Sequence, residues 1–397
     1  MSCAALLLVA GAACRRRTPT YHRDVAPILA RHCTGCHSER GVSPNPRMST
    51  YEQAVKDRMR IQRSVQRRKM PPWGADNTGR CGTWKAALWL DAGDIATIVS
   101  WVEAGTPAGE PADAPPPARR EPAPFRADAA VDIGAPYRPD LGSASYRCFL
   151  VDPRLAEDRM LTAIRVDSSE PRIVAQVTLF ALDEAGEAEA EALDAGESGA
   201  GYRCYGTART GGARLVASWT WDAPVLRLPP GTGLRLAAGR RMVLQIHYDL
   251  IAAGLSSSSR TRVDLELERP GAVTEAAVLP LQPAGFQLEG GRSHVEVSAE
   301  MTIDRAATIH AVAPRMHTLG LSMQLDRVAG QEARCLANFN HWMFYRQRLF
   351  VYEEPVSLAA GDRLRATCAY TTINRGPIAM GEDIGAEECV AYLYVTR

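Results

Sequence analysis

The chain has 397 residues, of which 46% are hydrophobic and 23% charged, so it can form ordinary buried cores and is not a disordered chain. Its formal net charge of +1 gives no reason to expect a nucleic-acid partner. The charge is unevenly shared, because residues 15–110 contain 16 basic and 9 acidic residues and the rest contains 30 basic and 36 acidic. We therefore expect a multi-domain protein in which a basic module precedes an acidic part.

The first residues resemble an export signal. About a dozen small and apolar residues run from Cys3 to Cys14 and are followed by three arginines. Such a run is too short to span a bilayer but has the length of a secretory hydrophobic region. We expect an export signal over residues 1–14 and a periplasmic or cell-surface location. Cys14 is either a lipid anchor, which would be the only membrane attachment, or the end of a plain cleaved signal.

Three short helices are predicted in a module that spans residues 19–109. Each has a candidate N-cap residue, and isoleucine and valine form an apolar stripe along the third, which Gly105 ends. The helices run from Asp24 toward His32, from Ser49 or Thr50 to about Arg68, and from Asp91 to Gly105. Residues 110–130 are rich in proline and alanine and are predicted to form a semi-stiff linker.

Beyond the linker the pattern changes to short runs rich in valine, leucine, isoleucine and tyrosine, separated by glycine, proline and aspartate. This spacing is typical of β-sandwiches, and the stretch is too long for one of them. A joint at residues 269–271 predicts one sandwich over residues 131–268 and a second over residues 269–397. The alanine- and glutamate-rich residues 183–201 are expected to form an exposed excursion, with a helix as the alternative.

The sequence Cys33-Thr-Gly-Cys36-His37 is the strongest motif in the chain. Two thiols at this spacing can form both thioether bonds of a c-type haem, and the next imidazole can reach the iron. The alternatives are a redox disulfide or a zinc site, but zinc needs further ligands and only Cys81 is available nearby. We predict haem c, attached at Cys33 and Cys36, with His37 as an axial ligand.

A sixth iron ligand is expected further along the chain. Met70 precedes two prolines that keep the segment extended, and Trp73 would shield the ring. The competing side chains are Met48, Met59, His22 and His32. Of these, Met59 is expected to lie in the core, and the two histidines are close in sequence to the first ligand. We predict that Met70 binds the iron. Two strong axial ligands leave no position for oxygen chemistry, so this module would transfer electrons.

Four stretches of the module together resemble a small bacterial cytochrome c domain often fused to copper monooxygenases. They are Tyr21–Leu29, Cys33–His37, Met70–Trp73 and Trp101–Pro107. In the β region, further stretches occur in the order found in the copper type II, ascorbate-dependent monooxygenases, the family of peptidylglycine alpha-hydroxylating and dopamine beta-monooxygenase. They are Tyr146–Phe149, Arg227–Gly231, Leu244–Tyr248, Pro314–His317, Leu319–Gly320, Gly381–Glu382 and Glu387–Cys389.

The resemblance implies a multi-domain fold, with a small all-α cytochrome c domain followed by two all-β jelly-roll sandwiches. The sandwiches would face each other across an open cleft, with one copper in each. The positions that correspond to copper ligands are Ala175, Gln176 and His247 in the first site and Arg315, His317 and Glu388 in the second. Only the two histidines are family ligands. The four replacements suit Cu(I) poorly, so copper is not expected as a cofactor.

Arg315 and Glu388 would converge on one former metal position, so we expect them to form an ion pair that fills it, with bidentate geometry favouring the pair. His247 and His317 are each expected to be hydrogen-bonded core residues rather than metal ligands. His310 and His341 remain unexplained, and a repurposed metal site that includes one of them stays open.

Six cysteines lie outside the leader and the haem motif: Cys81, Cys148, Cys204, Cys335, Cys368 and Cys389. An even number in an exported protein indicates disulfides. The resemblance implies a bond between Cys368 and Cys389. A Cys148–Cys204 bond is a further hypothesis. Cys81 is either a free thiol or bonded to Cys335, which would tie the module to its neighbour.

The leading hypothesis is an exported haem c electron-transfer protein whose monooxygenase-like sandwiches have lost copper chemistry and bind or dock a redox partner protein. One alternative is an active copper-dependent monooxygenase or oxidase that receives electrons from the haem, so whether the chain is an enzyme stays open. A second alternative is a structural subunit of a surface complex. Iron and copper content separates the first two.

Overall fold

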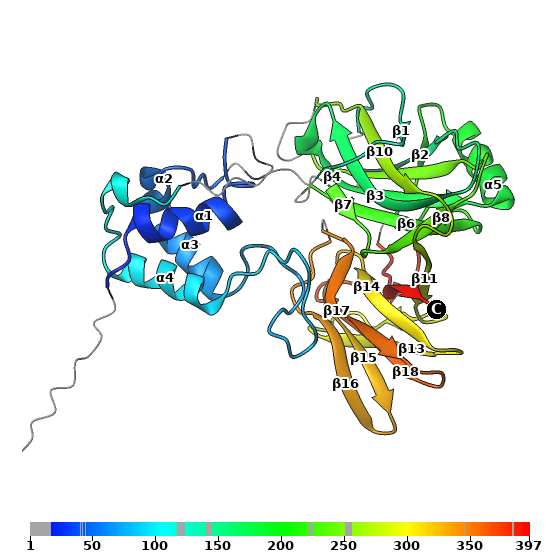
Figure 1. Ribbon diagram of the computed structural model, residues 1–397. Coiled ribbons are helices and arrows are strands. Elements are labelled where there is room, and N and C mark those ends of the chain that lie inside the picture. Colours follow the sequence, from blue (N-terminus) through cyan, green and yellow to red (C-terminus); the bar gives the residue numbers. More distant parts are fainter. Residues whose placement is uncertain are drawn as a thin grey trace, which may run out of the picture.

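The computed structural model describes residues 17–39, 41, 43, 45–116, 124–139, 145–221, 225–250, 256–344, 346–382 and 385–397. The predicted export signal, Cys14 and part of the linker lie outside these residues. Within them, no helix is long and apolar enough to cross a membrane. Most of the regular structure is β-sheet, as expected of a chain built largely from β-sandwiches (Figure 1).

Helices form the N-terminal part of the chain (Figure 1). They are η1 Tyr21–Val25, α1 Ala26–His32, α2 Tyr51–Lys56, α3 Arg58–Gln66, α4 Ala92–Glu103 and the short turn η2 Pro111–Asp113. Thr50 caps α2 and Asp91 caps α4, as predicted. Asp24 does not cap α1, because its carboxylate accepts a hydrogen bond from the Thr20 amide at 2.7 Å. The predicted helix over residues 51–68 is divided at Asp57 into α2 and α3.

One apolar core holds these helices together. Each of α1 to α4 contributes buried side chains at helical spacing, among them Leu29, Ile61, Ile98 and Trp101. The indole of Trp101 also donates to the carbonyl of Pro107 at 3.1 Å, which fixes the chain as it leaves α4. The amphipathic pattern of the sequence therefore produces the helical packing that it predicts.

The β part begins at residue 129. Its first strands are β1 Ala129–Asp132, β2 Ser145–Val151, β3 Arg159–Ser168, β4 Val174–Leu182, β5 Tyr202–Arg203, β6 Ala213–Thr220, β7 Val225–Arg227, β8 Thr232–Leu236, β9 Met242–Tyr248 and β10 Thr261–Glu268. The later strands are β11 Thr274–Leu281, β12 Gln287–Leu288, β13 Val295–Thr302, β14 Ala307–Arg315, β15 Gly320–Ala329, β16 Glu332–Phe339, β17 Phe350–Leu358, β18 Arg363–Tyr370, β19 Ile378–Ala379 and β20 Val390–Thr396. The turn η3 Pro171–Ile173 precedes β4, and residues 183–201 contain the helix α5 Glu184–Ala195.

The strands build two sandwiches that share one long sheet. Among the described residues this sheet has the order β1-β10-β3-β8-β11-β20-β14-β17. The long sheet passes from the first sandwich to the second between β8 and β11. These two strands are parallel, with Thr232 paired to Thr274. A second sheet, β5-β2-β9-β4-β6, faces the first half, and β13-β18-β15-β16 faces the second half. Separate apolar cores lie in the two halves.

Residues 71–90 extend from the helical part onto the second sandwich. Trp73 and Trp84 are buried in the core of that sandwich. The Trp73 ring meets Phe350 at 5.0 Å, and Trp84 stacks on Tyr352 at 4.4 Å. The expectation that Trp73 shields a haem ring is therefore wrong, because its apolar surface is already buried against the β-strands.

Three disulfides join the six cysteines outside the leader and the haem motif. Cys368 is bonded to Cys389 and Cys148 to Cys204, as hypothesised. Cys81 is bonded to Cys335 rather than free, and this bond links the segment after α3 to the second sandwich. Disulfides are typical of oxidising compartments, so these three bonds indicate an exported protein.

Candidate functional site

The Cys-x-x-Cys-His motif forms a turn directly after α1. The amides of Cys36 and His37 both donate to the carbonyl of Cys33, at 3.1 and 2.8 Å. Cys33 and His37 are buried, and both cysteines are thiols rather than a disulfide. Burial raises the pKa of Cys33 to about 12 and lowers the pKa of His37. A neutral imidazole is the form that binds metals, so the turn suits His37 as a ligand.

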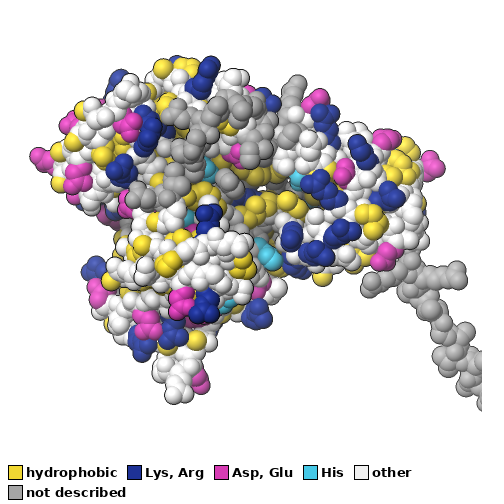
Figure 2. Space-filling model, turned by 180° about the vertical axis from the view of Figure 1, so that it is seen from behind, with side chains coloured by type: hydrophobic (Ala, Val, Ile, Leu, Met, Phe, Trp, Pro, Cys, Tyr) yellow, Lys and Arg dark blue, Asp and Glu magenta, His cyan; other side chains and the backbone are white. Residues whose placement is uncertain are grey.

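The motif side chains line a cavity of about 370 Å³ at the junction of the helical part and both sandwiches. The helical part contributes His32, Cys33, Cys36, His37, Ser43, Pro46, Met48, Arg60, Ile61, Ser64, Val65, Met70, Pro71 and Pro72. The sandwiches contribute Arg172, Val174, Ala175, Trp221, Asp249, Met343 and Arg346. Figure 2 shows hydrophobic side chains together with lysine and arginine where the helical part meets the β part. The cavity is therefore shared between parts far apart in the sequence.

The predicted axial ligand lies on the wall of this cavity. Met70 follows α3 and is 37% exposed. Met48 also lines the cavity, but its amide donates to the carbonyl of His37 at 2.9 Å, so its backbone lies beside the first ligand. His32 lines the cavity too, with its imidazole 3.7 Å from an aspartate of α4. Met59 is 51% exposed and does not line the cavity, so the expectation that it is a core residue is wrong.

Arg315 and Glu388 meet inside the second sandwich. Arg315 ends β14, Glu388 precedes β20, and these two strands are neighbours in the shared sheet. The Nε of Arg315 donates to Oε2 of Glu388 at 2.9 Å, and both side chains are 6% exposed. Burial alone would raise the pKa of Glu388, but the charge of Arg315 and the contacts with His317 together outweigh it, so the pKa is lowered. The predicted ion pair is confirmed, with Nε of Arg315 as the donor of the hydrogen bond rather than a bidentate arrangement.

The segment after β14 holds His317 beside this pair. Its Nε2 lies 3.4 Å from Oε2 of Glu388, and its Nδ1 lies 2.8 Å from the carbonyl oxygen of Ala386. The carboxylate of Glu387 accepts hydrogen bonds from the amides of His317 and Leu319 at 2.9 and 2.7 Å. Burial raises the pKa of Glu387. Two consecutive glutamates thus hold the backbone and the imidazole of one histidine.

In the first sandwich, Gln176 and His247, which the sequence singles out, also lie next to each other. His247 in β9 pairs across the sheet with Tyr146 of β2 and Gln176 of β4. The Tyr146 ring stacks on the imidazole at 4.2 Å with an interplanar angle of 3°. Burial, followed by the charge of Arg315, lowers the pKa of His247 to about 3. Gln176 donates to the carbonyl of Gln347 at 2.9 Å, which ties the two sandwiches together. Ala175 lies on the wall of the cavity.

Aromatic rings fill the space between the two histidine positions. The Phe344 ring lies 5.6 Å from His247 and 6.3 Å from His317. Tyr205 lies 4.6 Å from His317 and 5.2 Å from Tyr146. The open cleft implied by the family resemblance is therefore closed here, because these rings join the two positions by direct packing.

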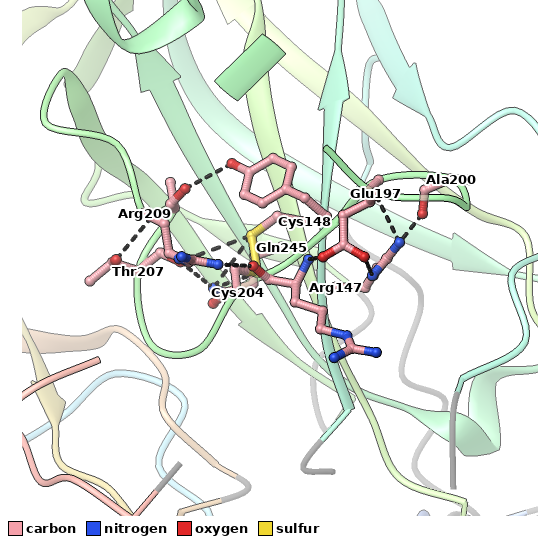
Figure 3. The surroundings of a disulfide bond; sticks show 12 residues. Arg147, Cys148, Glu197, Ala200, Cys204, Thr207, Arg209 and Gln245 are labelled. Carbon is pink, nitrogen blue, oxygen red and sulfur yellow. Dashed lines mark hydrogen bonds and ion pairs between the residues drawn. A yellow bond between two sulfur atoms is a disulfide. The ribbon is translucent and has the colours of Figure 1, made fainter. Parts of the chain in front are cut away.

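The loop that carries Tyr205 is fixed by the Cys148–Cys204 disulfide, as Figure 3 shows. The side-chain amide of Gln245 donates to a carbonyl of this loop at 2.8 Å. The loop adopts a positive φ of 85° at Gly206, where an added Cβ would lie 2.6 Å from Oε1 of Glu388. The first sandwich therefore covers the ion pair of the second at close range.

Comparison with known families gives a match for the second sandwich. Residues 270–395 match the family described as copper type II ascorbate-dependent monooxygenase, C-terminal domain. This range contains Arg315, His317 and Glu388. The second sandwich is therefore monooxygenase-like.

Two kinds of curated protein are similar to the chain. Dopamine beta-hydroxylase of Bos taurus is 26% identical over 199 residues, which cover 45% of this chain and 32% of that protein. Peptidylglycine alpha-amidating monooxygenase of Rattus norvegicus and its Mus musculus counterpart are 26% identical over 188 residues, which cover 46% of this chain and 19% of those proteins. The matched part is less than a third of the length of each relative.

The sequence led us to expect haem c as the cofactor and to exclude copper. The family match corrects the exclusion of copper. Copper is the metal named by the family that residues 270–395 match, so its exclusion was wrong. In the present arrangement His317 and Glu388 are ligand types that copper accepts, but Glu388 is paired with Arg315. Across the described ranges no group of three His, Cys, Asp or Glu side chains is arranged to hold a metal ion. We therefore assign no chemical step to copper.

Sequence reasoning missed the residues that join these positions. Phe344, Tyr205, Trp221 and Arg346 contact the candidate side chains or the cavity, yet no motif marks them. The one available signal is that residues 341–348 combine aromatic side chains with two arginines. His310, which the sequence left unexplained, contacts Thr396 at 2.8 Å rather than a metal position.

Proposed function

We propose that the protein is an exported electron-transfer protein in which residues 19–109 hold haem c and the monooxygenase-like sandwiches dock a redox partner protein. The observation that supports this proposal is the placement of Cys33, Cys36, His37 and Met70 on the wall of one cavity. The two thiols would bind the haem covalently, and the imidazole and the thioether would bind its iron. Haem held in this way exchanges single electrons.

The chain supplies the surroundings that such a group requires. Ile61, Val65 and Met48 belong both to the helical core and to the cavity wall, so they exclude water from one side. Backbone hydrogen bonds to the carbonyl of Cys33 hold the turn from which the two thiols and His37 line the cavity. These features support a rigid site, in which little has to move when an electron enters or leaves.

A second function is favoured by the family match. The sandwiches would then be an active copper-dependent monooxygenase that receives electrons from the haem. The observation behind it is the match of residues 270–395 to the copper type II monooxygenase family. Elemental analysis separates the two functions, because one iron per chain supports the first and additional stoichiometric copper supports the second.

Mass spectrometry of the purified full chain tests the haem. The proposal expects an added mass of one haem that survives denaturation, together with a c-type haem absorption spectrum. Cys33→Ala with Cys36→Ala should abolish both. Thr34→Ala is the matched control, because Thr34 lies between the two cysteines but has no thiol. Its hydroxyl donates a hydrogen bond to the carbonyl of Ala30. A wild-type chain without covalent haem would overturn the proposal.

A further inference from the structure

The outer wall of the cavity comes from the monooxygenase-like sandwiches. Val174 and Ala175 begin β4, Trp221 follows β6 and Asp249 follows β9. Met343 and Arg346 come from the segment between β16 and β17. A group that fills this cavity therefore touches the helical part on one side and both sandwiches on the other.

Arg346 connects the three parts of the chain that line the cavity, namely the helical part and the two sandwiches. It is 7% exposed, and its Nη1 donates to the carbonyl of Pro72, two residues after Met70. Its guanidinium lies over the Trp221 ring at 5.1 Å from the centroid. The residue thus links the loop of the predicted axial ligand to the first sandwich, while its own backbone belongs to the second.

Arg346 also differs from the other cations of the wall. Arg60 and Arg172 are exposed, and Arg172 pairs with Glu170 at 2.8 Å, so water and a carboxylate screen their charges. A buried charge is screened much less and acts more strongly on a nearby centre. The sandwich side also contributes Asp249, a half-buried carboxylate of opposite sign.

We propose that the sandwiches complete the haem pocket and set its redox potential through Arg346, acting as a positioning and tuning residue across the junction. This inference rests on the proposed function. A buried positive charge favours the reduced state of an iron centre, since reduction lowers the charge of the iron by one unit.

Spectroelectrochemical titration of the full-length haem protein tests this inference. Arg346→Gln should lower the midpoint potential by about 59 mV, a tenfold change in the equilibrium constant of a one-electron couple. Arg346→Lys keeps the charge and should restore most of that change. Asp249→Asn removes a negative charge and should raise the potential. A loss of folding would not shift the midpoint potentials of Arg346→Gln and Asp249→Asn in opposite directions.

Arg348→Gln is the matched control. Arg348 lies two residues along the same segment, over the rings of Trp73 and Phe350 at 5.3 and 5.8 Å, and does not line the cavity. It should leave the potential unchanged. If Arg346→Gln and Asp249→Asn leave the potential of an intact haem protein unchanged, or if Arg348→Gln shifts it equally, the inference is wrong and the proposed function stands. If the wild-type chain carries no haem, both are wrong.

Discussion

The guanidinium of Arg315 and the carboxylate of Glu388 meet at 2.9 Å inside the second sandwich, where β14 and β20 lie side by side. His317 lies 3.4 Å from the same carboxylate oxygen. Because the pair is buried, each charge depends on the other for compensation. The loop at Gly206, from the first sandwich, covers the pair.

Removing one partner of this pair should destabilise the protein strongly. Arg315→Met or Glu388→Gln alone is expected to lower the free energy of unfolding by about 3–5 kcal/mol, because the remaining charge stays buried without compensation. The double variant should lose much less than the sum of the single changes. Denaturant unfolding of the four proteins gives the coupling energy. Additive losses would contradict a direct ion pair.

A methyl group at Gly206 should disturb the covering loop. Gly206→Ala adds a Cβ 2.6 Å from Oε1 of Glu388, at a φ of 85°. Gly231→Ala is the matched control, since its φ is 72° but nothing lies within 4 Å of the added Cβ. The control isolates the cost of the left-handed backbone, about 1–2 kcal/mol. Thermal unfolding should show a clearly larger loss for Gly206→Ala, and equal losses would place the loop away from the pair.

His247 should make the protein sensitive to acid. Burial holds its pKa at about 3, below the ordinary value of 6.5, so unfolding takes up a proton between these two pH values. Its contribution is complete above pH 6.5 and is lost as the pH falls, by up to about 1.4 kcal/mol per pH unit. His247→Phe keeps a ring against Tyr146 and should flatten this dependence.

Unfolding free energies measured from pH 7 to pH 4 check this prediction. His294→Gln is the control, because the His294 side chain is 58% exposed and contacts Glu296 at the surface. The control should retain the wild-type slope. A His247→Phe variant with the wild-type slope would show that another group causes the acid sensitivity.

Met70 is predicted to bind the haem iron. Met70→Ala should remove the methionine-to-iron charge-transfer absorption at the red end of the oxidised spectrum and lower the reduction potential, since a methionine ligand raises it. Met59→Ala serves as the control, because Met59 is 51% exposed and lies off the cavity wall. If the band persists in Met70→Ala and disappears in Met48→Ala, the ligand is Met48.

The Cys81–Cys335 bond should stabilise the contact between the helical part and the second sandwich. It closes a sequence separation of 254 residues, whereas Cys368–Cys389 closes 21. Replacing both cysteines of the long link by serine should cost about 2–5 kcal/mol and exceed the loss from the short link, as the entropy of the closed loop predicts. Denaturant titration compares the two variants. Cleavage within residues 71–90 should also become faster in the first variant.

The sequence by itself predicts what depends on local hydrogen bonds and on spacing. Thr50 and Asp91 cap their helices because an N-cap side chain needs only an amide three residues ahead. The turn at Cys33 follows from the end of α1. The Arg315–Glu388 pair was predictable because the family resemblance brings two oppositely charged side chains to one place in the second sandwich.

The tertiary structure alone decides which surfaces meet. Trp73 belongs to the core of the second sandwich rather than to a haem pocket, because its ring packs against Phe350 of β17. Phe344 closes the space between His247 and His317, and Arg346 reaches the cavity from a segment with no motif. Most of these contacts join segments that are far apart in the sequence. The hydrophobic effect that drives them has no direction, so a local pattern of apolar residues does not show which surfaces will meet.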